Sequence, residues 1–162
     1  MLAAVSAGLA ALAAAIRTGR LSPVDLVERC LERIRATEER LHAFIHVDAE
    51  GAREAARRRE AEVRRGQVRG PLHGIPVAVK DLFDQAGLPT TAGAAIRRGH
   101  RAKTTSTAVQ RLLEAGAVVI GKTNLHEFAF GVTSVNPHFG AVANPWDTER
   151  VAGGSSGGSA AA

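Results

Sequence analysis

The chain has 162 residues, a length typical of one domain, and its 45% hydrophobic and 23% charged content exclude wholesale disorder, collagen and coiled coil. Its one cysteine, Cys30, excludes an internal disulfide and a cysteine-based zinc site, and it fits the reducing cytoplasm. The net charge is +5, but aromatic residues make up only 4% of the chain and there is no Tyr. We therefore expect no direct binding of nucleic acid through stacked bases.

Residues 1–70 are predicted to be mostly helical. Apolar side chains recur at steps of three and four along residues 2–16, which predicts a helix of a globular protein rather than a signal peptide or a membrane span. These side chains are Leu2, Val5, Leu9, Leu12 and Ile16. Ser22 followed by Pro23 and an acidic Asp25 predicts the start of a second helix, with an apolar face along residues 26–34.

A short extended segment and an Arg-rich helix follow. Residues 41–47 alternate His with apolar side chains, which predicts a strand whose His residues point away from the core and bind no metal. The run from Arg53 to Arg69 is the most basic part of the chain, but Glu residues are interleaved in it at helical spacing. This pattern favours Glu–Arg pairs on a solvated helix face over a patch that binds nucleic acid or an acidic partner.

Residues 71–162 are predicted to form an α/β fold, a sheet covered by helices. Apolar runs at 75–79 and 117–120 predict buried strands, and residues 105–115 between them predict a helix. A strand, a helix and a strand in this order indicate a parallel crossover. We expect a short helix at residues 124–130 and mostly loop from 131 to 150.

Two segments are candidates for chemistry. Lys80 directly follows the first buried strand, and ligands of α/β sheets bind at the carboxyl ends of strands. A partly desolvated Lys there could act as a general base, although a surface Lys paired with Asp81 or Asp84 is an equal alternative. The Gly/Ser run 153–159 could present backbone N–H groups to an oxyanion, or it could be a flexible linker. It does not match the pattern of a phosphate-binding loop.

Several motifs in this order together resemble the amidase signature family. The resemblance covers nearly the whole chain, and its specificity comes from the number of separate motifs. The motifs are Arg17–Pro23, Gly74–Asp81, Thr90–Gly93, Ala115–Ala117, Gly121–Asn124, His126–Ala129, Asn144–Asp147 and Gly153–Ser159.

The resemblance implies a mixed α/β sheet between helical layers and a Ser–Ser–Lys catalytic triad. Lys80 matches the catalytic lysine, and Ser155 matches the bridging serine, which the family holds after a cis peptide bond. The nucleophilic serine of the family lies in a later segment, beyond Ala162. We therefore expect residues 1–162 to be the N-terminal part of a single amidase domain, incomplete at the C-terminus. The supporting loop residues are Gly153, Gly154, Ser156, Gly157 and Gly158.

The implied function is hydrolysis of the C–N bond of a small-molecule amide, with no cofactor, no metal and no membrane. One alternative is the A subunit of a tRNA-dependent amidotransferase, a glutaminase; there Asn typically follows the Lys–Asp pair, and Leu82 here favours a free-standing amidase. The other alternative is an inactive fragment. We expect the chain alone to be inactive and to self-associate through uncovered apolar surface. Without the enclosing structure, the peptide bond before Ser155 is expected to relax to trans or the loop to lose order.

Overall fold

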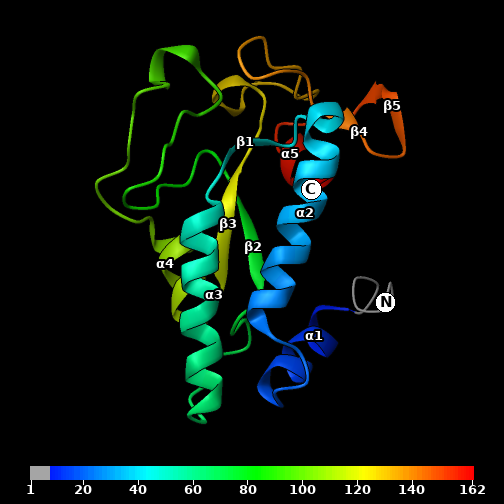
Figure 1. Ribbon diagram of the computed structural model, residues 1–162. Helices are drawn as coiled ribbons and strands as arrows, with labels where there is room; N and C mark the ends of the chain where they lie inside the picture. Colours follow the sequence, from blue (N-terminus) through cyan, green and yellow to red (C-terminus); the bar gives the residue numbers. More distant parts are fainter. Residues whose placement is uncertain (1–7) are drawn as a thin grey trace.

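The computed structural model describes residues 8–162 and shows a small sheet with helices on both faces (Figure 1). Helices α2 (Pro23–Leu41) and α3 (Ala49–Arg64) pack on one face, and α4 (Thr107–Glu114) packs on the other. The three strands are β1 (Phe44–Val47), β2 (Pro76–Lys80) and β3 (Val118–Thr123). The predicted class, an α/β fold with a sheet covered by helices, is confirmed.

Helix α1 ends, and helix α2 begins, close to where the sequence predicts. Helix α1 covers Leu9–Arg17, while Leu2 and Val5 of the predicted apolar stripe lie outside the described residues. Helix α2 begins after Ser22, whose hydroxyl oxygen accepts hydrogen bonds from the N–H groups of Val24 and Asp25. Such a cap satisfies N–H groups that have no partner inside the helix.

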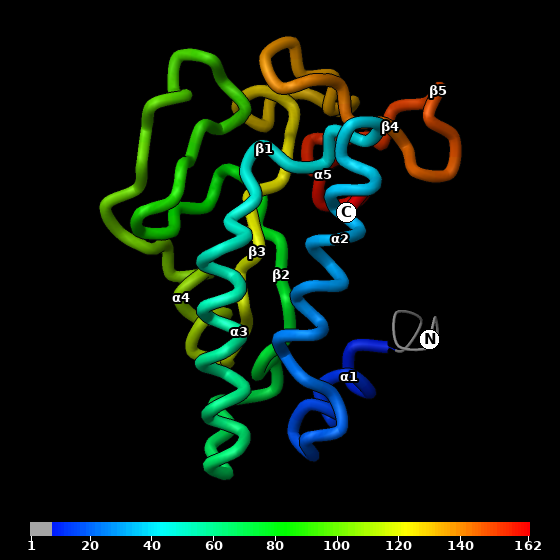
Figure 2. The backbone as a smooth tube through the Cα atoms, viewed as in Figure 1, coloured from blue at the N-terminus to red at the C-terminus, as the bar shows by residue number. Residues whose placement is uncertain are grey.

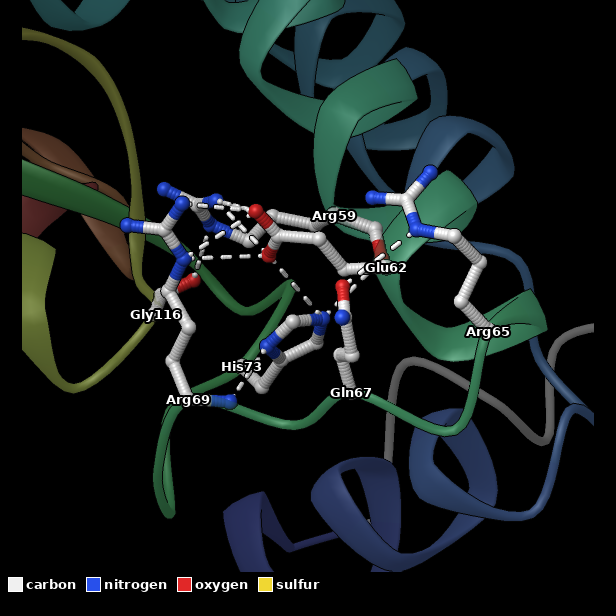
Figure 3. Close-up of polar contacts among 7 residues, drawn as sticks. All are labelled: Arg59, Glu62, Arg65, Gln67, Arg69, His73 and Gly116. Carbon is white, nitrogen blue, oxygen red and sulfur yellow. Dashed lines mark hydrogen bonds and ion pairs between the residues drawn. The ribbon is translucent and has the colours of Figure 1, made fainter.

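Helix α3 carries the predicted Glu–Arg pairs. Arg58 pairs with Glu54, and Arg64 pairs with Glu60 at 2.6 Å, both at helical spacing. A more buried set surrounds Glu62, whose carboxylate accepts hydrogen bonds from two guanidinium groups (Figure 3). The interpretation of the Arg run as a paired helix face is confirmed for these residues.

The Glu62 cluster links the end of α3 to the turn before β2. Arg59 and Arg69 bond to Glu62, and Arg59 also donates to the carbonyl of Gly116. Buried His73 accepts from the backbone N–H of Arg69 at 3.0 Å through Nδ1, and its Nε2 lies 2.9 Å from the carbonyl oxygen of Arg59. The hydrogen bonds to the Glu62 carboxylate, mainly from Arg69, lower the pKa of Glu62 to about 2.

The sheet is mixed, with strand order β1–β3–β2. Strand β2 pairs with β3 in parallel, as the strand–helix–strand order predicts, and β1 pairs with β3 antiparallel. The β2–β3 register shifts by one residue, because Val77 lies opposite Val119 whereas Ala78 lies opposite Gly121. Lys80 at the end of β2 is therefore opposite Thr123.

Apolar clusters hold the layers together. One joins α2 and α3 to β3, and its buried members are Val27, Leu31, Ala52, Ala56, Val118 and Ile120. On the other face, Val109 of α4 packs against Val79 and Val119. No helix within residues 8–162 is long and apolar enough to cross a bilayer.

Two local predictions were wrong, and a third, that residues 131–150 are mostly loop, is confirmed but missed a short hairpin. The segment predicted as extended from residue 41 begins its strand only at Phe44, because Leu41 still ends α2 and His42 adopts a left-handed conformation. The predicted helix 124–130 is only a short 3-10 turn, Glu127–Ala129. Within 131–150, strands β4 (Ala143–Asn144) and β5 (Asp147–Val151) form a hairpin whose long strand is fully exposed, so it lacks the apolar alternation that identifies strands.

Long loops occupy the end of the sheet where β2 and β3 terminate (Figure 2). They connect β2 to α4 and β3 to the short helix α5 (Gly157–Ala161). Because β2 and β3 are parallel, their carboxyl ends lie together at this end. Lys80 and the Gly/Ser run are both found here.

Candidate active site

Lys80 contacts the Gly/Ser run, as the site prediction requires. Its Nζ lies 2.8 Å from Ser155 Oγ and 2.8 Å from Ser156 Oγ, across 75 and 76 residues of sequence. Burial lowers the pKa of the Lys80 ammonium group below its ordinary value. The alternative of a surface Lys paired with an acid is wrong, because within the described part of the chain Lys80 forms no ion pair with Asp81 or Asp84, and Asp81 pairs with Lys122.

The Gly/Ser run is an ordered loop followed by a helix, not a flexible linker. The carbonyl oxygen of Ser155 accepts a hydrogen bond from the N–H of His126 at 3.1 Å. The peptide bond between Gly154 and Ser155 is cis, and Gly153 has φ +80°. Contacts within the chain therefore hold the loop around Ser155.

Three glycines of the run are needed because backbone or side-chain atoms of other segments lie close to them. A Cβ atom on Gly154 would lie 2.9 Å from Ser134 N, and one on Gly157 would lie 2.5 Å from Ser134 Oγ. A Cβ on Gly158 would collide with the carbonyl oxygens of Ala43 and Asn124. The glycines thus let the run pack directly against these neighbouring atoms.

Two N–H groups of the run are already used inside the protein. Gly157 N donates to Ser134 Oγ at 3.0 Å, and Gly158 N donates to the carbonyl of Asn124 at 3.1 Å. They anchor α5 and are not presented to a ligand. The expectation that the glycine-rich run offers its N–H groups to an oxyanion is therefore wrong for Gly157 and Gly158.

Buried polar residues that the sequence analysis did not single out hold the loops beneath the site. Asn124 donates to the carbonyls of His42 and Gly140, and Asn136 donates to those of Gly93 and Leu125. Both asparagines are at most 2% exposed. The available signal was that Asn124 directly follows a buried strand, where polar side chains often serve a site.

A hollow of about 330 Å³ opens beside Lys80. Its walls are mostly apolar side chains of β2 and α4 together with Phe83, and Lys80 and Ser156 lie at its edge. A larger hollow of about 500 Å³ lies between α2 and the C-terminal helix and does not include Lys80. Residues 8–162 hold no cluster of three or more His, Cys, Asp or Glu side chains that could bind a metal ion.

An α/β scaffold that unites a partly buried Lys with serines of a Gly/Ser loop has a clear counterpart among known families. The family model named Amidase matches residues 25–162. The chain belongs to this family, as the resemblance in the sequence predicts.

Curated relatives of the chain include proteins named as a subunit of an amidotransferase. The chain is 51% identical over 158 residues to a protein of Chloroflexus aggregans named as the A subunit of glutamyl-tRNA(Gln) amidotransferase, covering 98% of this chain and 32% of that protein. A protein of the same name from Thermobifida fusca is 47% identical over 153 residues, covering 94% and 31%. The chain spans about a third of the length of these relatives.

Solved structures with this fold include amidases. A structure described as an amidase is 47% identical with a TM-score of 0.89, covering 96% of this chain and 35% of that one. The native peptide amidase of Stenotrophomonas maltophilia is 36% identical with a TM-score of 0.89, covering 94% and 33%. The fold is that of amidase signature enzymes.

Proposed function

We propose that this chain carries two of the three catalytic residues of an amide hydrolase, with Lys80 as the general base and Ser155 as the proton relay. The observation that carries the proposal is the 2.8 Å contact between Lys80 Nζ and Ser155 Oγ. The lowered pKa of Lys80 supports it, because a general base must lose its proton near neutral pH.

In the proposed reaction, neutral Lys80 takes the proton of the Ser155 hydroxyl while Ser155 takes the proton of the nucleophilic serine. That serine attacks the carbonyl carbon of the amide, and a tetrahedral oxyanion forms. When the C–N bond breaks, the proton returns through Ser155 to the leaving nitrogen. Water then cleaves the acyl-enzyme by the same relay, and the products are a carboxylic acid and an amine or ammonia.

The nucleophile in this proposal belongs to residues outside the 162-residue sequence. Residues 1–162 then form the N-terminal part of one amidase domain, with residues 1–70 mostly helical and 71–162 supplying the signature region. The chain covers about a third of each relative, which supports the proposal that it is one part of a longer domain. The single Cys30, which is unpaired, supports a cytoplasmic location.

A second candidate function is the glutaminase of an amidotransferase. It is favoured by the 51% identity to a protein named as the A subunit of such an enzyme. This candidate requires glutamine as the amide and partner subunits that receive the ammonia. It uses the same Lys80 and Ser155, so the site assignment does not depend on the choice.

The first test measures ammonia release in two polypeptides, with simple amides and with glutamine as substrates. We expect none from the 162-residue chain and release from a longer polypeptide that includes the nucleophile segment. In the longer polypeptide, Lys80→Ala should lower kcat by about 10²–10⁴-fold, the range for loss of a general base. Glutamine as the preferred substrate would select the glutaminase.

Matched variants make the assignment specific. Ser155→Ala should lower kcat strongly, whereas Ser156→Ala, at the same distance from Lys80 but exposed, should lower it much less. Lys103→Ala controls for loss of an exposed lysine. Ammonia release by the 162-residue chain that disappears with Ser156→Ala would contradict both the roles and the missing nucleophile.

We also propose that the 162-residue chain self-associates through apolar side chains near the loop end of the sheet. The most exposed of these are Ile96, Phe130, Val132 and Trp146, each at least 78% exposed. Sedimentation over a range of concentrations should show dimers or larger species. Phe130→Ser together with Trp146→Ser should shift the chain towards monomer, and a chain that is monomeric at all concentrations would refute this proposal.

A further inference from the structure

Asp81 directly follows Lys80, and each of its polar groups forms a hydrogen bond within the protein. The backbone N–H of Asp81 donates to the carbonyl of Thr123 at 3.1 Å, and its carbonyl accepts from Ala92 N at 2.9 Å. Its Oδ2 accepts from both N and Oγ1 of Thr91, at 2.8 and 2.5 Å. Asp81 therefore joins the end of β2 to β3 and to the loop that follows it.

Lys122 completes this network. Its Nζ donates to Asp81 Oδ1 at 2.8 Å, to the carbonyl of Pro89 at 2.7 Å and to Thr90 Oγ1 at 3.1 Å. An ammonium group has three N–H donors, so all of them are satisfied. Asp81 and Lys122 are both 0% exposed, which makes them a fully buried ion pair.

Lys80 and Asp81 are neighbours in the chain, but one belongs to the candidate site and the other to the buried network. Successive side chains of a strand point to opposite faces. Lys80 reaches the serines of the Gly/Ser run, while Asp81 reaches Lys122. On β3 the same split recurs, because Thr123 Oγ1 lies 2.7 Å from Ser159 Oγ whereas Lys122 is in the network.

We propose that the buried Asp81–Lys122 ion pair is a positioning device for Lys80, which keeps its amine against Ser155 and partly out of water. The inference rests on the proposed function, since it explains how the base is held. A fixed neighbour on the opposite face holds the Lys80 backbone, so that its side chain leaves the end of β2 on the side of the serines. Buried ion pairs are a costly way to gain stability, so a role in specifying one arrangement accounts for this one.

The test follows the titration of Lys80 by NMR in the chain labelled with ¹³C-lysine. The chain contains only three lysines, Lys80, Lys103 and Lys122, so each Cε signal can be assigned by substitution. The test variant is Asp81→Asn with Lys122→Met, which removes the pair as a neutral unit and leaves no unpaired buried charge. We expect the Lys80 pKa to move upwards, towards its ordinary value, as the side chain becomes more solvated.

A distant ion pair provides the matched control. Glu28→Gln with Arg53→Gln removes a pair that joins α2 to α3 at 2.6 Å, and it should leave the Lys80 titration unchanged. A second variant, Thr91→Val, removes one hydrogen bond to Asp81 and the bond that Thr91 accepts from Gly93 N, keeps the ion pair, and should shift the Lys80 pKa upwards by less. It keeps the test decisive if the double variant fails to fold, which circular dichroism on the same samples detects.

The outcomes separate the two proposals. If Lys80 in the unmodified chain titrates below Lys103 but does not shift in a folded variant, the positioning role is overturned while Lys80 as base stands. If Lys80 in the unmodified chain titrates together with Lys103, the base assignment fails, and the positioning role fails with it. An upward shift in both variants, with none in the control, supports the positioning role.

Discussion

The helical region before β2 and the loop region after it are held together by different interactions. In the first, α2 and α3 bury an apolar stripe against the sheet and carry their ion pairs mostly on the outside. In the second, long loops are fixed by buried polar side chains, among them Asn124, Asn136 and the Asp81–Lys122 pair. An apolar core tolerates substitution by apolar side chains of similar volume, whereas a buried polar group destabilises the fold when its hydrogen-bond partner is removed.

The largest expected effect is on the buried pair. Asp81→Asn leaves the Lys122 ammonium without a countercharge in the interior, so the free energy of unfolding should fall by about 3–5 kcal/mol. Asp147→Asn is the control, because the Asp147–Arg150 pair is exposed and should contribute less than about 1 kcal/mol. Urea denaturation measures both. Equal losses would show that burial does not determine how much an ion pair contributes to stability.

Next comes the apolar core of the helical region. Leu31→Ala removes a side chain that is 1% exposed and should lower the free energy of unfolding by about 2–5 kcal/mol. Leu9→Ala makes the same change at a side chain that is 55% exposed, and it should change the stability by less than about 0.5 kcal/mol. Leu31→Met should keep most of the stability, because similar volumes are tolerated, and a loss as large as that of Leu31→Ala would contradict this reasoning.

The Glu62 cluster gives a pH dependence at the boundary of the two regions (Figure 3). The pKa of Glu62 is lowered from 4.5 to about 2, so its stabilising contribution is complete above pH 4.5 and is lost as the pH falls towards 2. Glu62→Gln should cost about 1.5–3 kcal/mol at neutral pH, the range for hydrogen bonds to a charged group. In thermal melts, the Glu62→Gln variant should lose less stability between pH 4.5 and 2 than the unsubstituted chain does.

Glu54→Gln is the matched control for this pH dependence, since the Glu54–Arg58 pair lies on the exposed face of α3. It should lower the stability at neutral pH far less than Glu62→Gln. An unchanged pH profile in Glu62→Gln would mean that other carboxylates account for the acid sensitivity.

The smallest expected effect is at a helix cap. Ser22→Ala removes the oxygen that accepts from Val24 and Asp25, and it should lower the free energy of unfolding by about 1 kcal/mol. Ser106→Ala is the control at the start of α4, where the Ser side chain makes no cap hydrogen bond. A loss at Ser106 as large as that at Ser22 would contradict the capping interpretation.

The two regions also differ in how well the sequence predicts them. Ser22, the Glu–Arg pairs and the position of Lys80 depend on neighbours within a few residues or on apolar periodicity, and they were predicted. The roles of Ser134, Asn124 and Asn136 depend on backbone groups up to 82 residues away, which no local pattern encodes. The β4–β5 hairpin was missed for a related reason, since its exposed strand has no apolar face.

The opposite orientations of Lys80 and Asp81 have a consequence for insertions and deletions in this chain. A shift of one residue between β2 and β3 would turn Asp81 towards the serines and leave Lys80 beside Lys122 in the interior. Segment 76–81 therefore has a fixed length, although its individual apolar residues can vary. Insertions and deletions are expected instead in the exposed turn 95–101. This turn lies between residues 89–91, which bond to Asp81 and Lys122, and helix α4.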